Sequence, residues 1–215
     1  MLIIENIGGF RQGDNRWHGT KDMHELVLAQ LDDYSALSVR IHYRSWNSNW
    51  KAIATDTKLL KNRYWHEPFG IVVNCFSYGA GWGLRRYAHY LLRSNLQIAC
   101  AVISDGILRP WTKLLAWQSI IGRYPIHLPD NILTYHGFYQ DVSRPSGVQP
   151  VGNAKCLSWE NLHVEHILMD DEPQWHARCV EVAKDHAKLF VQSRSAVPVG
   201  APESEAIELR TAESQ

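Results

Sequence analysis

The sequence predicts an α/β protein, a three-layer sandwich in which helices cover both faces of a mostly parallel central sheet. Short apolar runs alternate with segments of helical periodicity along most of the chain, the order expected when parallel strands are joined by crossover helices. Apolar runs such as residues 96–104 (LQIACAVIS) are almost continuous, as in strands that are covered on both faces. A length of 215 residues suits one well-buried core better than two full domains.

The first part of the chain predicts three strands and two helices. Residues 2–7 (LIIENI) are mainly apolar and end at two glycines, which is typical of a buried strand followed by a turn. Apolar spacing predicts a helix from Thr20 to Leu31 and another from Trp50 to Tyr64, the second stopped by Pro68. Alternation over residues 36–43 and the apolar run 70–76 predict the second and third strands.

The rest of the chain continues the alternation of strands and helices, which becomes less regular after Asp105. The pattern predicts helices over residues 79–93, 111–121 and 172–190, and strands over residues 96–104, 132–139 and 162–164. We therefore expect one domain over residues 1–192. Within it, residues 107–131 form an insertion that carries a lid or pocket helix, with core packing preferred over a mobile lid. Residues 193–215 are small, polar and proline-containing, and predict a disordered tail.

Composition and charge exclude several classes of protein. The 22 basic residues balance the 22 acidic ones, so the basic footprint of a nucleic-acid binder is missing. No apolar run approaches the roughly 20 residues of a membrane span. The N-terminal run is too short for a signal peptide, which predicts a cytoplasmic protein. The four cysteines are scattered, and we expect reduced, buried thiols.

Ser77 stands in the segment with the strongest chemical signature. Residues 75–79 read CFSYG between a predicted buried strand and a predicted helix. A nucleophile elbow needs a serine at such a sharp strand-to-helix turn, with small residues two before and two after it. Gly79 meets this need, whereas Cys75 replaces the usual first glycine of G-x-S-x-G. An alternative is a glycine-rich helix start that packs or binds an anion.

From the first strand to the last helix, the chain resembles the α/β-hydrolase (lipase/esterase) superfamily in a minimal version. Residues 77–81 (SYGAG) are similar to its Ser-Tyr-Gly-Gly form of the elbow, and residues 166–171 (HILMDD) are similar to the histidine loops of its small members. The resemblance implies the chain order nucleophile, acid, base. It places the catalytic histidine before the closing helix, where His166 stands.

His166 is therefore the expected base for Ser77, in preference to His163, which would lie inside the preceding strand, and to the earlier His136. An imidazole base needs a carboxylate that fixes its tautomer. Asp105 follows an apolar strand at the carboxyl edge of the sheet, where active sites of open α/β folds lie. The resemblance favours an acid after the next strand, where Asp141 is available, so both remain open with Asp105 preferred.

Backbone N–H groups are expected to stabilise the oxyanion of the reaction. The N–H of Tyr78 follows the nucleophile, and a second N–H should come from the glycine loop after the first strand, at Phe10. Trp111 and Trp117 lie close enough in sequence to Asp105 to line a substrate pocket.

These residues predict a serine hydrolase that cleaves a carboxylic ester or thioester of a small or lipid-like molecule through an acyl-enzyme. The alternative is an inactive binding protein that keeps the α/β-hydrolase fold. A metal hydrolase is disfavoured because HVEH at residues 163–166 does not match a zinc signature. We expect neither a metal nor a cofactor.

Overall fold

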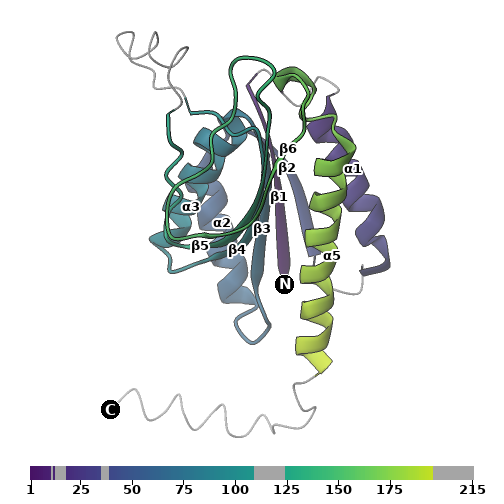
Figure 1. Cartoon of the computed structure of the whole chain (residues 1–215). Helices are drawn as coiled ribbons and strands as arrows, with labels where there is room; N and C mark the ends of the chain where they lie inside the picture. Colours follow the sequence, from purple (N-terminus) through teal and green to yellow (C-terminus); the bar gives the residue numbers. More distant parts are fainter. Residues whose placement is uncertain (11, 13–17, 35–38, 109–123, 196–215) are drawn as a thin grey trace, which may run out of the picture.

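The computed structural model describes residues 1–10, 12, 18–34, 39–108 and 124–195, and its centre is a six-stranded parallel sheet (Figure 1). The strands are β1 (Leu2–Gly8), β2 (Val39–Ser45), β3 (Gly70–Phe76), β4 (Ile98–Ser104), β5 (Ile132–Tyr139) and β6 (Lys155–Asn161). Their order is β2-β1-β3-β4-β5-β6, and each neighbouring pair is parallel. The predicted α/β class with a parallel sheet is therefore confirmed.

Helices cover both faces of the sheet. They are α1 (Gly19–Leu31), α2 (Trp50–Arg63), α3 (Arg85–Leu92) and α5 (Pro173–Ser195). A π-helical segment, η2 (Gly79–Leu84), leads into α3, and short 3₁₀ turns lie at η1 (Asp32–Tyr34) and η3 (His166–Leu168). Figure 1 shows α1 and α5 on one side of the sheet and α2 and α3 on the other, which gives the three expected layers.

Strand β3 shows why residues 70–76 are apolar at almost every position. Its side chains alternate between two cores, because successive residues of a strand point to opposite faces. Ile71, Val73 and Cys75 belong to the core under α2 and α3. Val72 and Phe76 belong to the core under α1 and α5. A strand in the middle of the sheet must therefore be apolar at almost every position.

The last strand lies where the sequence did not predict it. The strand expected at residues 162–164 is not formed, and β6 instead covers Lys155–Asn161 at the edge of the sheet. An edge strand pairs on one side only, and β6 is exposed along its first half, so it needs little hydrophobic pattern. Leu162 and Val164 gave the misleading signal because they pack, half buried, against the α1 and α5 core.

Some element boundaries also differ from the prediction. Helix α5 continues to Ser195, past the position where the tail was expected to begin. Residues 196–215 and the predicted helix 111–121 lie outside the described residues. Of the expected insertion, Ile126 and Leu128 are buried in the core under α2 and α3. These two residues belong to the body of the domain.

All four cysteines are free, and they differ in exposure. Cys75, Cys100 and Cys179 are buried, whereas Cys156 is exposed on β6. The expectation of reduced thiols is met, but the expectation that all are buried was wrong for Cys156. In the described part of the chain, no helix combines the length and the apolar character that crossing a membrane would need.

Candidate active site

Ser77 lies at a strained turn directly after β3. Its φ angle is 53°, in the left-handed region that non-glycine residues adopt rarely and at functional sites. The turn is held by its backbone: Ser77 N donates to Ser104 O (3.0 Å), and Ser77 O accepts from the N–H groups of Ala80 (3.1 Å) and Ile107 (3.1 Å). These hydrogen bonds thus hold Ser77 in its strained conformation, as a nucleophile elbow requires.

Two small residues allow the close packing around this turn. A Cβ added to Gly79 would lie 2.5 Å from the carbonyl oxygen of Ile7 at the end of β1, so only glycine fits without movement of the backbone. A Cβ added to Gly9 would lie 3.0 Å from the Cβ of Ser77. The loop after β1 is therefore in contact with the elbow, as the sequence predicted for a loop that could supply an N–H group.

Cys75 takes the position of the missing glycine without disturbing this geometry. Its side chain is fully buried in the core under α2 and α3, and its thiol donates to the carbonyl oxygen of Val102 on the neighbouring strand β4 (3.7 Å). Burial raises the pKa of the Cys75 thiol well above its usual range. Cys75 is thus a small core residue that remains a neutral thiol.

His166 reaches Ser77 from the turn that follows β6. The Oγ of Ser77 lies 3.0 Å from His166 Nε2. The imidazole stacks on Phe76, with ring centroids 5.2 Å apart, and the backbone N–H of His166 donates to Ser143 Oγ (2.8 Å). A stacked ring and an anchored backbone leave the imidazole little freedom of orientation.

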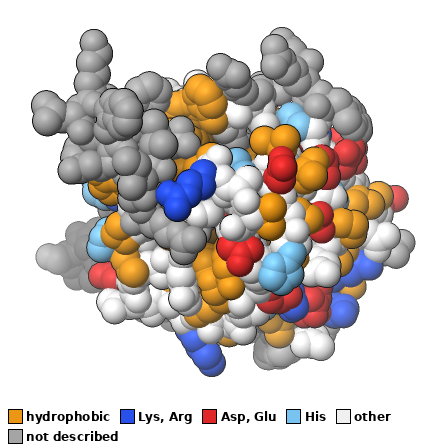
Figure 2. All heavy atoms as spheres, turned by 45° about the horizontal axis from the view of Figure 1, so that its top comes forward, with side chains coloured by type: hydrophobic (Ala, Val, Ile, Leu, Met, Phe, Trp, Pro, Cys, Tyr) orange, Lys and Arg blue, Asp and Glu red, His pale blue; other side chains and the backbone are white. Residues whose placement is uncertain are grey.

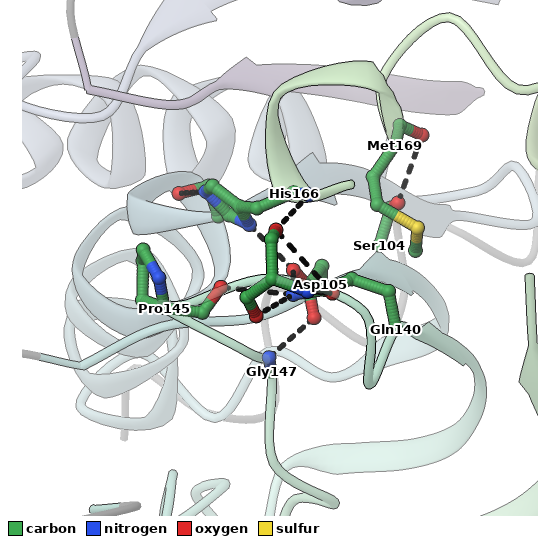
Figure 3. Close-up of polar contacts among 9 residues, drawn as sticks. Ser104, Asp105, Gln140, Pro145, Gly147, His166 and Met169 are labelled. Carbon is green, nitrogen blue, oxygen red and sulfur yellow. Dashed lines mark hydrogen bonds and ion pairs between the residues drawn. The ribbon is translucent and has the colours of Figure 1, made fainter. Parts of the chain in front are cut away.

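Asp105 completes a chain of contacts between three side chains. It follows β4, is fully buried, and lies with an oxygen 2.5 Å from His166 Nδ1 (Figure 3). An ionised carboxylate can only accept hydrogen bonds, so the imidazole proton lies on Nδ1 and Nε2 accepts from Ser77. The structure brings together the preferred serine, histidine and aspartate.

Gln140 was not predicted from the sequence, yet its side chain holds Asp105 in place. Its amide nitrogen donates to Asp105 Oδ2 (3.1 Å) and also to the carbonyl oxygens of Ser143 and Pro145 (both 2.9 Å). The other oxygen of Asp105 accepts from Gly147 N, as Figure 3 shows. An isolated glutamine carries no sequence signal for such a role, because the loop 143–147 that it binds is recognisable only in three dimensions.

Asp141 lies apart from this arrangement. Its nearest ionic partner is His163 Nδ1 (3.7 Å), and both side chains are largely exposed. His163 itself follows β6 and does not lie inside the strand, so the reason given for rejecting it was wrong. His136 lies on β5 and contacts Ser158 Oγ (2.9 Å). None of these three residues is hydrogen-bonded to Ser77 or Asp105.

A cavity of about 280 Å³ opens beside Ser77. Its apolar lining consists of Phe10, Phe76, Tyr78, Ile107, Pro145 and Ile167, and its polar lining of Gln12, Ser77, His166 and Asp170. The rings of Phe10 and Tyr78 pack 5.5 Å apart, so the two residues expected to supply N–H groups lie together at the cavity. Trp111 and Trp117 lie outside the described residues.

Figure 2 turns the carboxyl ends of the strands toward the viewer and shows hydrophobic side chains mixed with acidic, basic and histidine side chains.

Gln12 links the loop after β1 to the loop that carries His166. Its side-chain oxygen accepts from Gly9 N (2.7 Å) and Thr20 Oγ1 (3.0 Å), and its amide nitrogen donates to Asp170 Oδ2 (2.5 Å). Burial and the neighbouring carboxylate of Asp171 raise the pKa of Asp170 to about 6. Sequence reasoning missed both Gln12 and Asp170, because they are 158 positions apart.

Within the described ranges, no group of three or more His, Cys, Asp or Glu side chains is arranged to hold a metal ion. His176 on α5 contacts the carbonyl oxygen of Asp170 (2.6 Å). No protein-family model matches the chain, and no curated protein sequence matches it.

Proposed function

We propose that this protein is a serine hydrolase of the α/β-hydrolase type, which cleaves carboxylic esters or thioesters through an acyl-enzyme on Ser77. The observation that carries the proposal is the chain of contacts from Ser77 Oγ to His166 Nε2 and from His166 Nδ1 to buried Asp105. The positive φ angle of Ser77 directly after a central strand supports the same function.

In the proposed first step, His166 Nε2 takes the hydroxyl proton of Ser77 as Oγ attacks the carbonyl carbon of the substrate. Asp105 stabilises the imidazolium that forms and keeps its proton on Nδ1. The carbonyl oxygen becomes an oxyanion, which the backbone N–H groups of Tyr78 and Phe10 stabilise. The imidazolium then donates its proton to the leaving alkoxide or thiolate, and the acyl group remains on Ser77.

The second step repeats this chemistry with water. His166 takes a proton from a water molecule that attacks the acyl carbonyl carbon. As the tetrahedral intermediate collapses, the imidazolium of His166 donates this proton to the departing Ser77 Oγ. The carboxylic acid is released and the free enzyme is restored. The mostly apolar cavity of about 280 Å³ favours a small, uncharged acyl or alcohol group over a long one.

The decisive experiment combines a fluorophosphonate probe with p-nitrophenyl esters of increasing chain length. We expect the wild-type protein to be labelled and to hydrolyse the short esters best. Ser77→Ala should abolish labelling, and Ser77→Ala and His166→Ala should each lower kcat about 10⁴-fold or more. His163→Ala, a matched control in the same loop, should behave as wild type because its side chain is exposed and away from Ser77.

Two results would contradict the proposal. Labelling that survives Ser77→Ala would remove Ser77 as the nucleophile. A folded wild-type protein that is neither labelled nor active on any ester, but binds aromatic ligands, would favour the inactive binding protein.

A further inference from the structure

A second cavity, of about 420 Å³, lies beside η2 and α3 and shares no lining residue with the cavity at Ser77. Its wall is formed from one side by η2 and α3 and from the other by the segment that leads into β5. Its main side chains are Trp82, Arg85, Arg86, His89, Tyr90 and His127. We call it the basic pocket.

The cations of the basic pocket are not neutralised by described carboxylates. In the part of the chain that the structure describes, the arginines in ion pairs are Arg44 and Arg178. Arg85 donates from Nε to the carbonyl oxygen of His127 (3.1 Å), an uncharged acceptor. Asp130, which is near this segment in sequence, accepts instead from Asn153 (2.9 Å). The pocket thus concentrates positive charge in a chain of zero net charge.

Partial burial makes the positive charge of Arg85 less favourable. Arg85 is half buried, and desolvation lowers the pKa of its guanidinium. A buried cation without an anionic partner is unfavourable, and a bound anion would offset that cost through charge-assisted hydrogen bonds.

The second guanidinium is already oriented. Arg86 lies over the indole ring of Trp82, 4.9 Å from its centroid. Stacking on an aromatic face fixes the plane of a guanidinium and leaves its N–H groups at the edge. Two guanidinium groups and two imidazoles in one cavity provide many donors and suit a doubly charged oxyanion better than a single carboxylate.

We propose that the basic pocket binds the phosphate group of a small phosphorylated molecule. Arg85 and Arg86 hold the phosphate oxygens, and the rings of Trp82 and Tyr90 contact the organic body of the ligand. The volume of 420 Å³ falls within the roughly 300–1,000 Å³ of small-molecule sites. This site is independent of the proposed hydrolase activity, since none of its residues lines the cavity at Ser77.

Calorimetric titration with phenyl phosphate at constant ionic strength tests the proposal. We expect saturable binding to the full-length protein, with inorganic phosphate binding more weakly. Arg85→Gln combined with Arg86→Gln should raise the Kd at least about tenfold, because charge-assisted hydrogen bonds are lost. Arg40→Gln, which removes one exposed positive charge on β2, should leave the Kd unchanged. Ser77→Ala should bind as wild type does, whether or not the protein is a hydrolase.

Absence of saturable phenyl phosphate binding would overturn the proposal. So would an equal loss of affinity in Arg40→Gln, which would indicate general charge attraction, or binding to phosphatidic acid vesicles without binding to phenyl phosphate. Equal affinity for inorganic phosphate would overturn the role given to Trp82 and Tyr90. If the double variant does not fold, Arg86→Gln alone provides the same comparison, since Arg86 is exposed on α3.

Discussion

Asp105 follows β4 and Asp141 follows β5, and the two carboxylates have different surroundings. The sequence left a choice between two aspartates that follow neighbouring strands. The structure separates them: Asp105 is buried and contacts His166, whereas Asp141 is exposed and pairs with His163. Asp105 also has a φ angle of 42°, a conformation that Asp and Asn tolerate better than most residues.

Exchange of each aspartate for asparagine tests this assignment. Asp105→Asn should lower kcat about 10³- to 10⁴-fold, because an amide can donate to Nδ1 and so stabilise the wrong tautomer of His166. Asparagine keeps the volume and the tolerated backbone angle, so thermal unfolding should show a folded protein. Asp141→Asn should change kcat by less than about twofold. A large loss of activity in Asp141→Asn alone would reverse the assignment.

The cysteines give a second prediction for single residues. Burial raises the pKa values of Cys75, Cys100 and Cys179, while Cys156 is exposed. Because the thiolate is the reactive form, Cys156 alone should react rapidly with Ellman's reagent in the native protein at pH 8. Cys156→Ser should abolish the rapid phase, and unfolding should release the other three thiols. Rapid reaction of more than one native thiol would contradict the burial of at least one of the other three cysteines.

At the level of elements, the loop after β1 matters because it joins parts of the site that are distant in sequence. Gln12 binds Gly9 N on one side and Asp170 on the other. Tyr43 on β2 donates from its hydroxyl to the carbonyl oxygen of Gln12 (3.2 Å). These bonds set the position of the loop that presents Phe10 beside Ser77, so we infer that Gln12 is a positioning residue.

Gln12→Ala should therefore affect the reaction more than substrate binding. We expect kcat on a short p-nitrophenyl ester to fall about 10- to 100-fold, since removal of an oxyanion donor costs roughly 10²–10³ and here the donor is only displaced. KM should change by less than about twofold. Gln30→Ala on α1, whose partner is Lys184, serves as the control. An unchanged kcat in Gln12→Ala would show that the loop keeps its position without this bond.

On the scale of the whole molecule, Asp170 connects the loops around Ser77 to α1 and α5, the two helices of one layer. Its side chain binds Gln12, its carbonyl oxygen is contacted by His176 on α5, and Gly19 at the start of α1 packs against it. Its folded pKa of about 6 exceeds the ordinary value of 3.8. Ionisation of Asp170 therefore lowers the free energy of unfolding of the native protein. This loss of stability is absent below about pH 4 and complete above about pH 6.

Asp170→Asn should reveal this cost as a pH dependence of stability. Relative to wild type, its free energy of unfolding should rise as the pH increases from 4 to 7, by up to about 3 kcal/mol, because the shift of about two pKa units no longer applies. Urea unfolding at several pH values measures the difference. Asp185→Asn, an exposed site on α5, should show no such trend. A difference between Asp170→Asn and wild type that is constant with pH would contradict the raised pKa.

The sequence by itself determined the α/β class, most of the strands and the serine turn. These features depend on local physics: continuous apolar runs, helical spacing, and small residues after Ser77. It misplaced β6, because an edge strand needs little hydrophobic signal. It also carried no signal for Gln140, Gln12 or Asp170, whose roles arise from hydrogen bonds between loops that lie apart in the chain.

Tertiary structure alone decided which carboxylate faces His166 and how the site is held together. Parallel pairing brings the ends of β3 and β4 to one edge, and the turn after β6 brings His166 to the same place. Burial of Asp105 and exposure of Asp141 then follow from packing around them. Burial and contact are properties of the folded chain, so no local pattern could have distinguished these two aspartates.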